Sequence, residues 1–306
     1  MKLRPPTLAD IPAITAVTND LSQAHYGRDE MSEADYRLSF EAPEFDPAED
    51  ALVVEEDGRI VAYAEVFDPS EEGRRVWILI DVGPGAHDAV RHSLFDAMEA
   101  KARARQAPGG SVKVYLASKD EPMATLLAGR GYAVTRHSFR MEADLTAEPD
   151  RPVWPDGISV RTFRRGEDDQ AVYEAQEETF ADQFDASPMS YEEWRHWSFG
   201  SAFDPDLWFL AEDGDRLAGI LLARPERAGD ASLGWVSVLG VRRPWRRRGL
   251  GRALLLHAFG ELRGRGKPRV GLGVDAESPT GAVRLYERAG MRVVRRSDHW
   301  EKDLLA

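Results

Sequence analysis

Residues 234–259 read GWVSVLGV, then RRPWRRRGLG, then RALLLHAF. The first eight residues are typical of a β-strand, and Pro244 ends that run. From Leu250 onward the apolar residues keep to one face of a helix, which predicts a helix over 250–262. Gly249 and Gly251 stand at the turn between them. The stretch therefore predicts a strand, a glycine-containing turn and a helix, in that order.

The turn at 246–251 is suited to holding an anion. The first turn of a helix leaves backbone N–H groups free, and the helix N-terminus adds partial positive charge. Gly249 and Gly251 remove side chains where a phosphate would approach the backbone. Six arginines between Arg242 and Arg252 raise the local positive potential of a chain whose net charge is -13. We expect a polyphosphate here; the alternative, a solvated basic turn that touches nucleic acid, is disfavoured by the glycine spacing.

Two other phosphate-binding patterns fit less well. The turn begins a possible G-x-G-x-x-G dinucleotide fingerprint, but Leu254 replaces its third small residue. The acidic residue expected about twenty positions later is not clearly placed, because Glu261 is too near and Asp275 only approximate. A Walker phosphate loop is excluded, since no Gly-Lys-Ser/Thr sequence occurs.

The chain repeats itself once. Residues 126–132 (LLAGRGY) align with residues 285–291 (LYERAGM) at an offset of 159 residues, and four identities follow at the same offset. Residues 59–62 align with residues 216–219 at an offset of 157. Two nearly equal offsets indicate one duplicated domain with small insertions, rather than a short-period solenoid.

A proline-rich segment separates the copies. Residues 148–157 (EPDRPVWPDG) hold three prolines, which block a regular helix or a central strand. We therefore predict a first domain over 1–147, a linker over 148–157 and a second domain over 158–306. Both copies combine runs typical of strands with longer runs at helical spacing, so the predicted fold class is α/β or α+β.

At 246–251, the sequence RRRGLG resembles the coenzyme-binding signature Gln/Arg-x-x-Gly-x-Gly/Ala of the GCN5-related N-acetyltransferase (GNAT) superfamily. Residues 270–275 resemble the strand that follows in the family, and residues 278–291 resemble the next helix. For that helix we expect Ser278 as N-cap, Pro279 at the first position and Gly290 at the C-terminal stop. The resemblance covers residues 158–304 well and residues 2–145 weakly. It implies two tandem GNAT-like domains, each a mixed, mostly antiparallel sheet flanked by helices.

The resemblance also implies acetyl-coenzyme A as acyl donor. Backbone amides from Arg247 to Arg252 would hold its pyrophosphate, and the splayed strand at 239–241 would offer backbone groups to the pantetheine arm and the thioester. The implied coenzyme-binding residues are Leu239, Gly240, Val241, Arg246, Arg247, Arg248, Gly249, Leu250, Gly251, Arg252 and Ser278.

Tyr286 matches the general acid of the family. A phenol, whose ordinary pKa is about 10, suits the protonation of a departing thiolate, so no covalent enzyme intermediate is needed. The alternative is that Tyr286 is only a core residue of its helix.

No general base is evident in the sequence. In related two-domain enzymes a strand glutamate serves near the position of Trp235, and tryptophan cannot accept a proton. Asp275, Glu277, Glu178 and Asp182 stay open as bases, and each could equally be a surface or capping residue. The acceptor pocket is expected around residues 179–185 with Trp194, Trp197 and Trp235, although these tryptophans could equally be core.

The first copy lacks the signature. At an offset of 160, Ala86, Ala89 and Arg91 stand at the positions of Arg246, Gly249 and Gly251, and Leu127 stands at that of Tyr286. We expect it to be a degenerate structural partner, with an independent activity as the alternative.

The predicted function is transfer of an acetyl group from acetyl-coenzyme A to a primary amine of a small molecule. Alternatives are a peptide N-terminal acetyltransferase and a non-catalytic acyl-coenzyme A sensor. Composition predicts a cytoplasmic protein that binds neither nucleic acid nor membrane, because the chain is acidic, has no cysteine and shows no apolar span or leader. We expect a monomer or homodimer, and no metal site, since the seven histidines show no zinc-binding pattern.

Overall fold

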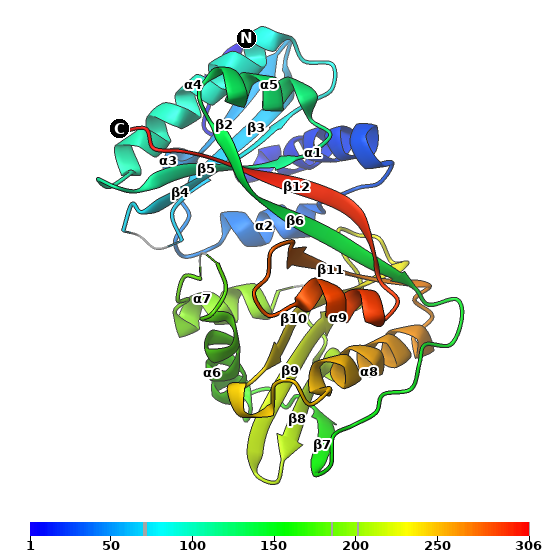
Figure 1. Ribbon diagram of the computed structural model, residues 1–306. Coiled ribbons are helices and arrows are strands. Elements are labelled where there is room, and N and C mark those ends of the chain that lie inside the picture. Colours follow the sequence, from blue (N-terminus) through cyan, green and yellow to red (C-terminus); the bar gives the residue numbers. More distant parts are fainter. Residues whose placement is uncertain (70–71, 185, 201, 306) are drawn as a thin grey trace. The chain divides into compact units, whose positions relative to one another are not determined.

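The computed structural model describes residues 1–69, 72–184, 186–200 and 202–305. The chain forms two compact units (Figure 1). Unit 1 comprises Met1–Ser138 and the described residues from Arg295 onward, and unit 2 comprises Phe139–Val294. Residues 295–305 therefore belong to unit 1. The domain ranges predicted from the repeat stay a prediction about the duplicated sequence.

Unit 1 is a sheet covered on both faces. Its strands are β1 (Lys2–Arg4), β2 (Ala51–Glu56), β3 (Arg59–Phe67), β4 (Arg75–Val82), β5 (Ser111–Ala117) and part of β12 (Arg292–Lys302). Its helices are the 3-10 helix η1 (Leu8–Asp10), α1 (Ile11–Tyr26), α2 (Glu33–Phe40), α3 (Pro47–Asp50), α4 (Asp88–Arg105) and α5 (Glu121–Gly129). Apolar residues of α4 pack on one sheet face, and those of α1 and α2 pack on the other (Figure 1).

Unit 2 repeats this plan. Its strands are β7 (Ile158–Thr162), β8 (Trp208–Asp213), β9 (Arg216–Arg224), β10 (Leu233–Val241), β11 (Arg269–Asp275) and part of β6 (Ala133–Asp144). Its helices are α6 (Asp169–Phe180), α7 (Tyr191–Ser198), α8 (Leu250–Gly264), α9 (Ala282–Arg288) and the 3-10 helices η2 (Pro205–Leu207) and η3 (Arg243–Trp245). The core under α8 includes Leu254, Leu255 and Phe259, while residues of α6 and α7 join the core on the opposite face.

Strand order is the same in the two units. In unit 1, β1 to β4 pair antiparallel in sequence and β4 pairs parallel with β5. In unit 2, β7 to β10 pair antiparallel and β10 pairs parallel with β11. The next position is filled by β12 beside β5 and by β6 beside β11. Each unit thus takes part of the other copy's last strand, and the mixed, mostly antiparallel fold is confirmed.

The duplication extends to side-chain detail. Arg4 donates two hydrogen bonds of 2.8 Å to Asp10 and one of 3.2 Å to Glu55. In unit 2, Arg161 donates to Asp168 at 2.6 and 2.8 Å and to Glu212 at 2.9 Å. In both units a shift in strand register falls just before the glutamate. We call each set a fork; the two forks lie 157 or 158 residues apart, which matches the offset of the repeat.

Candidate functional site

The predicted strand, turn and helix around residue 250 are present in unit 2. β10 ends at Val241, η3 spans Arg243–Trp245, and α8 begins at Leu250. Gly249 is the N-cap of α8 and has φ 88°, a left-handed conformation that favours glycine. Arg247 also has positive φ, at 61°. The turn therefore has two residues in left-handed backbone conformations. α8 itself is fixed by an apolar face that is fully buried.

Six consecutive amides of this turn are free. The backbone N–H groups from Arg247 to Arg252 have no hydrogen-bond acceptor among the described residues, and the first α8 bond is donated by Ala253 to the carbonyl of Gly249. Arg247, Arg248 and Gly249 are exposed. Unpaired donors at the N-terminus of a long helix form an anion-binding site. We call residues 247–252 the amide cradle.

The two glycines are needed for different reasons. A Cβ at Gly249 would meet nothing within 4 Å, so its positive φ is what demands glycine there. A Cβ at Gly251 would lie 3.2 Å from the Leu285 side chain and 3.6 Å from that of Val241. Gly251 is buried, and its missing side chain lets α8 approach α9 and β10. The expectation that both glycines clear space for a phosphate is therefore wrong for Gly251.

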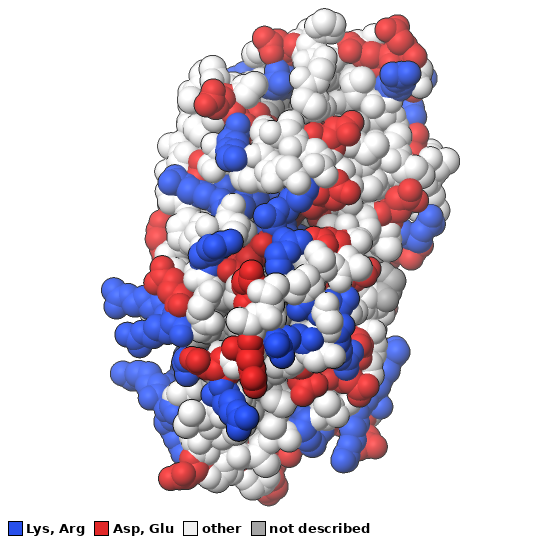
Figure 2. Space-filling model, turned by 90° about the vertical axis from the view of Figure 1, so that its right-hand side faces the viewer, with Lys and Arg blue, Asp and Glu red and all other residues white. Residues whose placement is uncertain are grey.

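Four of the six arginines of the turn are paired with carboxylates, which reduces the positive potential expected there. Arg242 binds Glu178 at 2.6 Å, Arg252 binds Asp150 at 2.8 Å, and Asp182 binds two others. Figure 2 shows acidic and basic side chains interspersed over one face of the molecule. Arg247 and Arg248 have no ion pair within the described ranges, so they supply the uncompensated charge beside the amide cradle.

β10 separates from β11 beside the cradle. Their parallel pairing runs from Leu233 with Arg269 to Val236 with Leu272 and stops there, although both strands continue. Beyond that point, residues 238–241 of β10 pair with β9, and Ser237 is the extra residue at a shift in register. The predicted splay at Leu239, Gly240 and Val241 is thus present, and it leaves backbone groups of β10 unpaired on the side of β11.

A β-bulge lies at the start of the splay, between Val236 and Val238. Before the bulge, a Cβ at Gly234 would contact Leu262 of α8. After it, Leu239 packs in the α8 core, while a Cβ at Gly240 would contact Thr179 of α6. The bulge therefore reverses the alternation of side chains along β10. Sequence reasoning missed it, although the rise in offset between the copies was a signal that residues had been inserted.

Tyr286 lies in α9 and is 8% exposed. Burial raises the pKa of its phenol to about 12. In the part of the chain that the structure describes, its hydroxyl has no hydrogen-bond partner. The phenol is therefore protonated at any working pH, and its donor is available.

Ser278 does not cap α9. The helix begins at Ala282, and its N-cap is Gly281 with φ 73°, so the predicted N-cap at Ser278 and first position at Pro279 are wrong. The Ser278 carbonyl accepts from the Gly281 amide at 3.2 Å, which closes a turn before the helix. Gly290, with φ 91°, does follow the helix C-terminus as expected.

The candidate bases are mostly engaged. Glu178 pairs with Arg242, and hydrogen bonds from Arg243 and then Arg246 lower the pKa of Asp182. Asp275 accepts a hydrogen bond from the Glu277 amide at 3.0 Å, which closes a turn. A carboxylate whose pKa is lowered by guanidinium groups is a poor proton acceptor, so Asp182 is disfavoured as a base.

The tryptophans expected near the acceptor have different surroundings. Trp194 is 1% exposed and donates to Gln176 at 3.2 Å, so it belongs to the core. Trp235 is half-buried on β10, with the Arg227 guanidinium 4.4 Å from its ring centroid. Trp197 is half-buried in α7. Of the segment 179–185, Thr179 is buried and Phe184 is exposed, whereas Asp185 lies outside the described residues.

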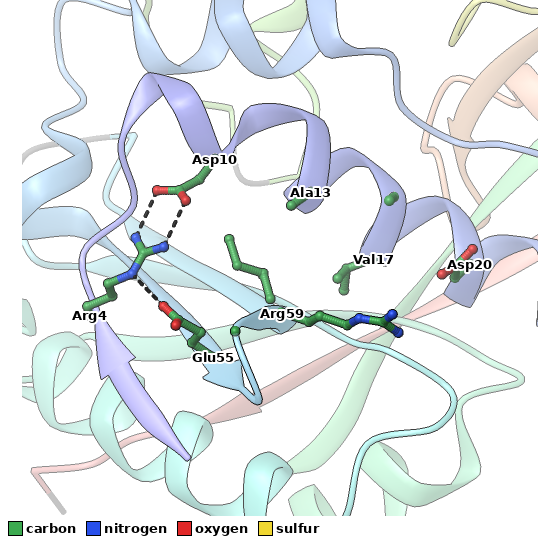
Figure 3. A pocket seen from close by; sticks show the side chains of 10 residues that line it. Arg4, Asp10, Ala13, Val17, Asp20, Glu55 and Arg59 are labelled. Carbon is green, nitrogen blue, oxygen red and sulfur yellow. Dashed lines mark hydrogen bonds and ion pairs between the residues drawn. The ribbon is translucent and has the colours of Figure 1, made fainter.

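One pocket in unit 1 was not expected. It measures about 450 Å³ and is lined by the fork Arg4, Asp10 and Glu55, with Asp20 and Arg59 beside residues of α1 (Figure 3). The same fork recurs in unit 2. In both units it links the first strand to the start of a helix and to the second strand. We therefore assign the fork to structure rather than to chemistry.

Neither a metal site nor a membrane helix is found within the described ranges. No three side chains of His, Cys, Asp or Glu gather closely enough there to hold a metal ion. No helix of those residues is both long and apolar enough to cross a membrane.

Comparisons with known proteins agree with this geometry. Residues 170–291 match the model of the acetyltransferase (GNAT) family. A mycothiol acetyltransferase of Geodermatophilus obscurus is 32% identical over 92% of this chain and 91% of its own length. One of Thermobispora bispora is 37% identical over 60% of this chain and 62% of its own length, so that match spans less than two thirds of the relative.

Solved structures extend the likeness to the whole chain. A GCN5-related N-acetyltransferase from Sphaerobacter thermophilus is 32% identical, with a TM-score of 0.79 over 98% of this chain and 95% of that one. A tandem GNAT protein from the clavulanic acid biosynthesis pathway, at 17% identity and a TM-score of 0.72, shares the fold over 98% of both chains. With its signature turn, its splayed strands and these relatives, the chain belongs to the GNAT family of acetyltransferases, in the tandem form.

Proposed function

We propose that this acetyltransferase uses acetyl-coenzyme A as donor and transfers the acetyl group to a primary amine of a small molecule by direct attack. The observation that carries the proposal is the amide cradle, six consecutive unpaired amides at the N-terminus of α8. A diphosphate offers acceptor oxygens to such donors, and the exposed Arg247 and Arg248 add charge of the right sign.

The remaining donor contacts follow from the splay. Unpaired backbone groups at 239–241 would bind the pantetheine arm, and an amide there would stabilise negative charge on the thioester oxygen. Acetyl-coenzyme A supplies the activated acyl group. Arg246 would act indirectly, since its side chain binds Val241 and Asp182 within the protein. Ser278 would contact the coenzyme from the turn before α9.

Tyr286 would serve the departing sulfur. Its pKa of about 12 is above that of a thiol, which for cysteine is about 8.5, so complete proton transfer to a thiolate is uphill. A hydrogen bond from the phenol to the sulfur, strengthening as charge develops there, is the easier role. The general base stays open, because Trp235 replaces the strand glutamate and two candidate carboxylates are held by arginines.

Unit 1 would be catalytically silent. Its β4 also separates from β5, after Ile78 and Val114, but β4 has no bulge. Asp81 in that splay accepts a hydrogen bond of 2.6 Å from Thr18, and burial raises the pKa of its carboxyl. A carboxylate there and the absence of the glycine signature both oppose an anionic coenzyme. Cytoplasmic location and a monomeric or homodimeric state remain predictions.

The test is thiol release from acetyl-coenzyme A over a panel of amines that includes the acceptor of the mycothiol acetyltransferases. Amine-dependent release supports the proposal. Coenzyme binding without turnover for any amine would favour the sensor instead, which the missing glutamate at Trp235 motivates. Release only with peptides would favour the peptide N-terminal acetyltransferase.

A further inference from the structure

Asp182 bridges two arginines next to the amide cradle. It lies two residues past the end of α6, and its Oδ1 accepts from Arg243 Nη2 at 2.6 Å. Its Oδ2 accepts from Arg246 Nη1 at 2.9 Å. These two arginines stand at the start of η3 and directly after it. One carboxylate therefore spans the turn that leads into the cradle.

Arg246 extends this bridge to the splayed strand. Its Nε donates to the carbonyl of Val241, the last residue of β10, at 2.9 Å. The next residue, Arg247, holds a left-handed backbone conformation, which a non-glycine residue keeps only where its neighbours impose it. The contacts of Arg246 are the nearest such restraint. By holding Arg246, Asp182 restrains the position of the next residue, Arg247, whose amide is the first of the cradle.

Simple electrostatics would oppose a carboxylate here. Negative charge is unfavourable just past the C-terminus of a helix such as α6, and it repels a nearby diphosphate. If charge alone governed this site, removal of Asp182 would tighten coenzyme binding. The two guanidinium groups compensate that charge, which leaves the geometry of the turn as the reason for a carboxylate at this position.

We propose that Asp182 is a positioning residue of the coenzyme site: by bridging Arg243 and Arg246 it holds the turn so that the cradle amides converge before the coenzyme arrives. This inference rests on the proposed function, because it assumes that the cradle holds the coenzyme diphosphate. Asp182 itself does not touch the coenzyme.

The experiment compares Asp182→Asn with the wild type by calorimetry with coenzyme A and by steady-state kinetics. Asparagine keeps the size of the side chain but removes the charge that binds both arginines. We expect the Kd for coenzyme A and the KM for acetyl-coenzyme A to rise about fivefold, the range for loss of an exposed ion-pair network, while kcat stays near wild type. Asp182→Glu should restore much of the affinity, because it restores the carboxylate.

Glu167→Gln is the matched control. Glu167 pairs with Arg164 at 3.5 Å in the same unit, so this variant makes the same charge change at an exposed ion pair that does not involve the turn. Its coenzyme affinity should equal that of the wild type. A general effect of net charge would move both variants together.

Two results would overturn the inference. If wild-type protein binds coenzyme A and Asp182→Asn binds it equally well or more tightly, Asp182 does not position the cradle, and the proposed function stands. If wild-type protein binds no coenzyme A, the proposed function fails and the role of Asp182 fails with it.

Discussion

Gly249 has two properties that suit its turn to ligand binding: its backbone conformation and the open space beside it. Its positive φ disfavours most other residues, although a Cβ at this position would meet no atom within 4 Å. Open space beside six unpaired amides is what an incoming anion requires. Backbone conformation and ligand access are therefore separate demands at this position, and substitutions can separate them.

Gly249→Asp should abolish measurable coenzyme binding. The substitution costs about 1 kcal/mol of backbone strain and places a carboxylate against the diphosphate. Calorimetry with coenzyme A measures the loss. Gly266→Asp is the control, since Gly266 follows the end of α8 with φ 76° and is equally unobstructed. Equal losses of affinity in both variants would mean that strain alone is responsible.

Tyr286→Phe should lower kcat about a hundredfold, the lower range for loss of one hydrogen-bond donor to a developing charge, with little change in the KM for acetyl-coenzyme A. Phenylalanine fills the same space in the core, so folding should be preserved. Steady-state kinetics on an acceptor from the amine panel would measure the change. A wild-type rate would remove Tyr286 from the mechanism and leave it as a core residue.

Among the elements, β10, α8 and α9 form the site as one packed group. The bulge and the splay free the backbone of β10, and the buried face of α8 sets the direction of its N-terminus. Gly251 is where these elements meet, next to Leu285 and Val241. The precision of the cradle therefore depends on helix packing as well as on the turn.

Gly251→Val should destabilise unit 2 by about 1–3 kcal/mol, because its side chain would force α8 away from α9. Urea unfolding measures the loss. Gly260→Val is the control: Gly260 is exposed in the same helix, a Cβ there meets nothing within 4 Å, and any residue but proline improves helix propensity. A Gly251→Val variant as stable as the control would contradict the close packing of α8 on α9.

At the scale of the molecule, the two units share the same strand order and the same fork, but they differ in the residues at the position of the amide cradle. Both forks tie the first strand to the residue before a helix and to the second strand. Among the described residues, only unit 2 combines a bulge in the strand before the cradle, β10, with a glycine-containing cradle. Stability and function are thus carried by different parts of the repeated unit.

Arg4→Gln and Arg161→Gln should each destabilise the unit that carries the substitution by about 1–3 kcal/mol, since each leaves partly buried carboxylates without their cation. Hydrogen exchange should report faster opening in that unit. Arg74→Gln, which removes an exposed pair with Glu72, should have no effect. Uniform exchange changes across both units would contradict two independent braces.

The Arg4 effect should also depend on pH. The pKa of Asp10 is lowered to about 2, from an ordinary value of 3.8, and the hydrogen bond from Arg4 is the largest cause. A carboxyl group whose pKa is lower in the folded state stabilises that state fully at pH values above its unfolded-state pKa. This stabilisation is lost as the pH falls through the folded-state pKa. The difference between wild type and Arg4→Gln should therefore shrink between pH 3.8 and about 2, as unfolding at a series of pH values would show.

The local features of the site follow from the sequence alone. Glycine at 249 and 251, apolar residues on one face of 250–262 and the proline at 244 are short-range signals, because backbone sterics and helix periodicity act within a few residues. The duplication was equally visible, since an offset is a property of the chain. These signals were enough to predict the strand, turn and helix and the duplicated domain, and the resemblance of residues 246–251 to the GNAT signature indicated the family and its tandem fold.

Only the tertiary structure decided what surrounds those features. It paired four arginines of the turn with carboxylates distant in sequence, turned Gly251 toward Leu285, and started α9 four residues after Ser278. It also placed residues 295–305 in unit 1, where β12 pairs with β5. Ion pairs, close packing and strand exchange join groups that are distant in sequence and come together only when the chain folds. Local sequence patterns therefore do not predict them.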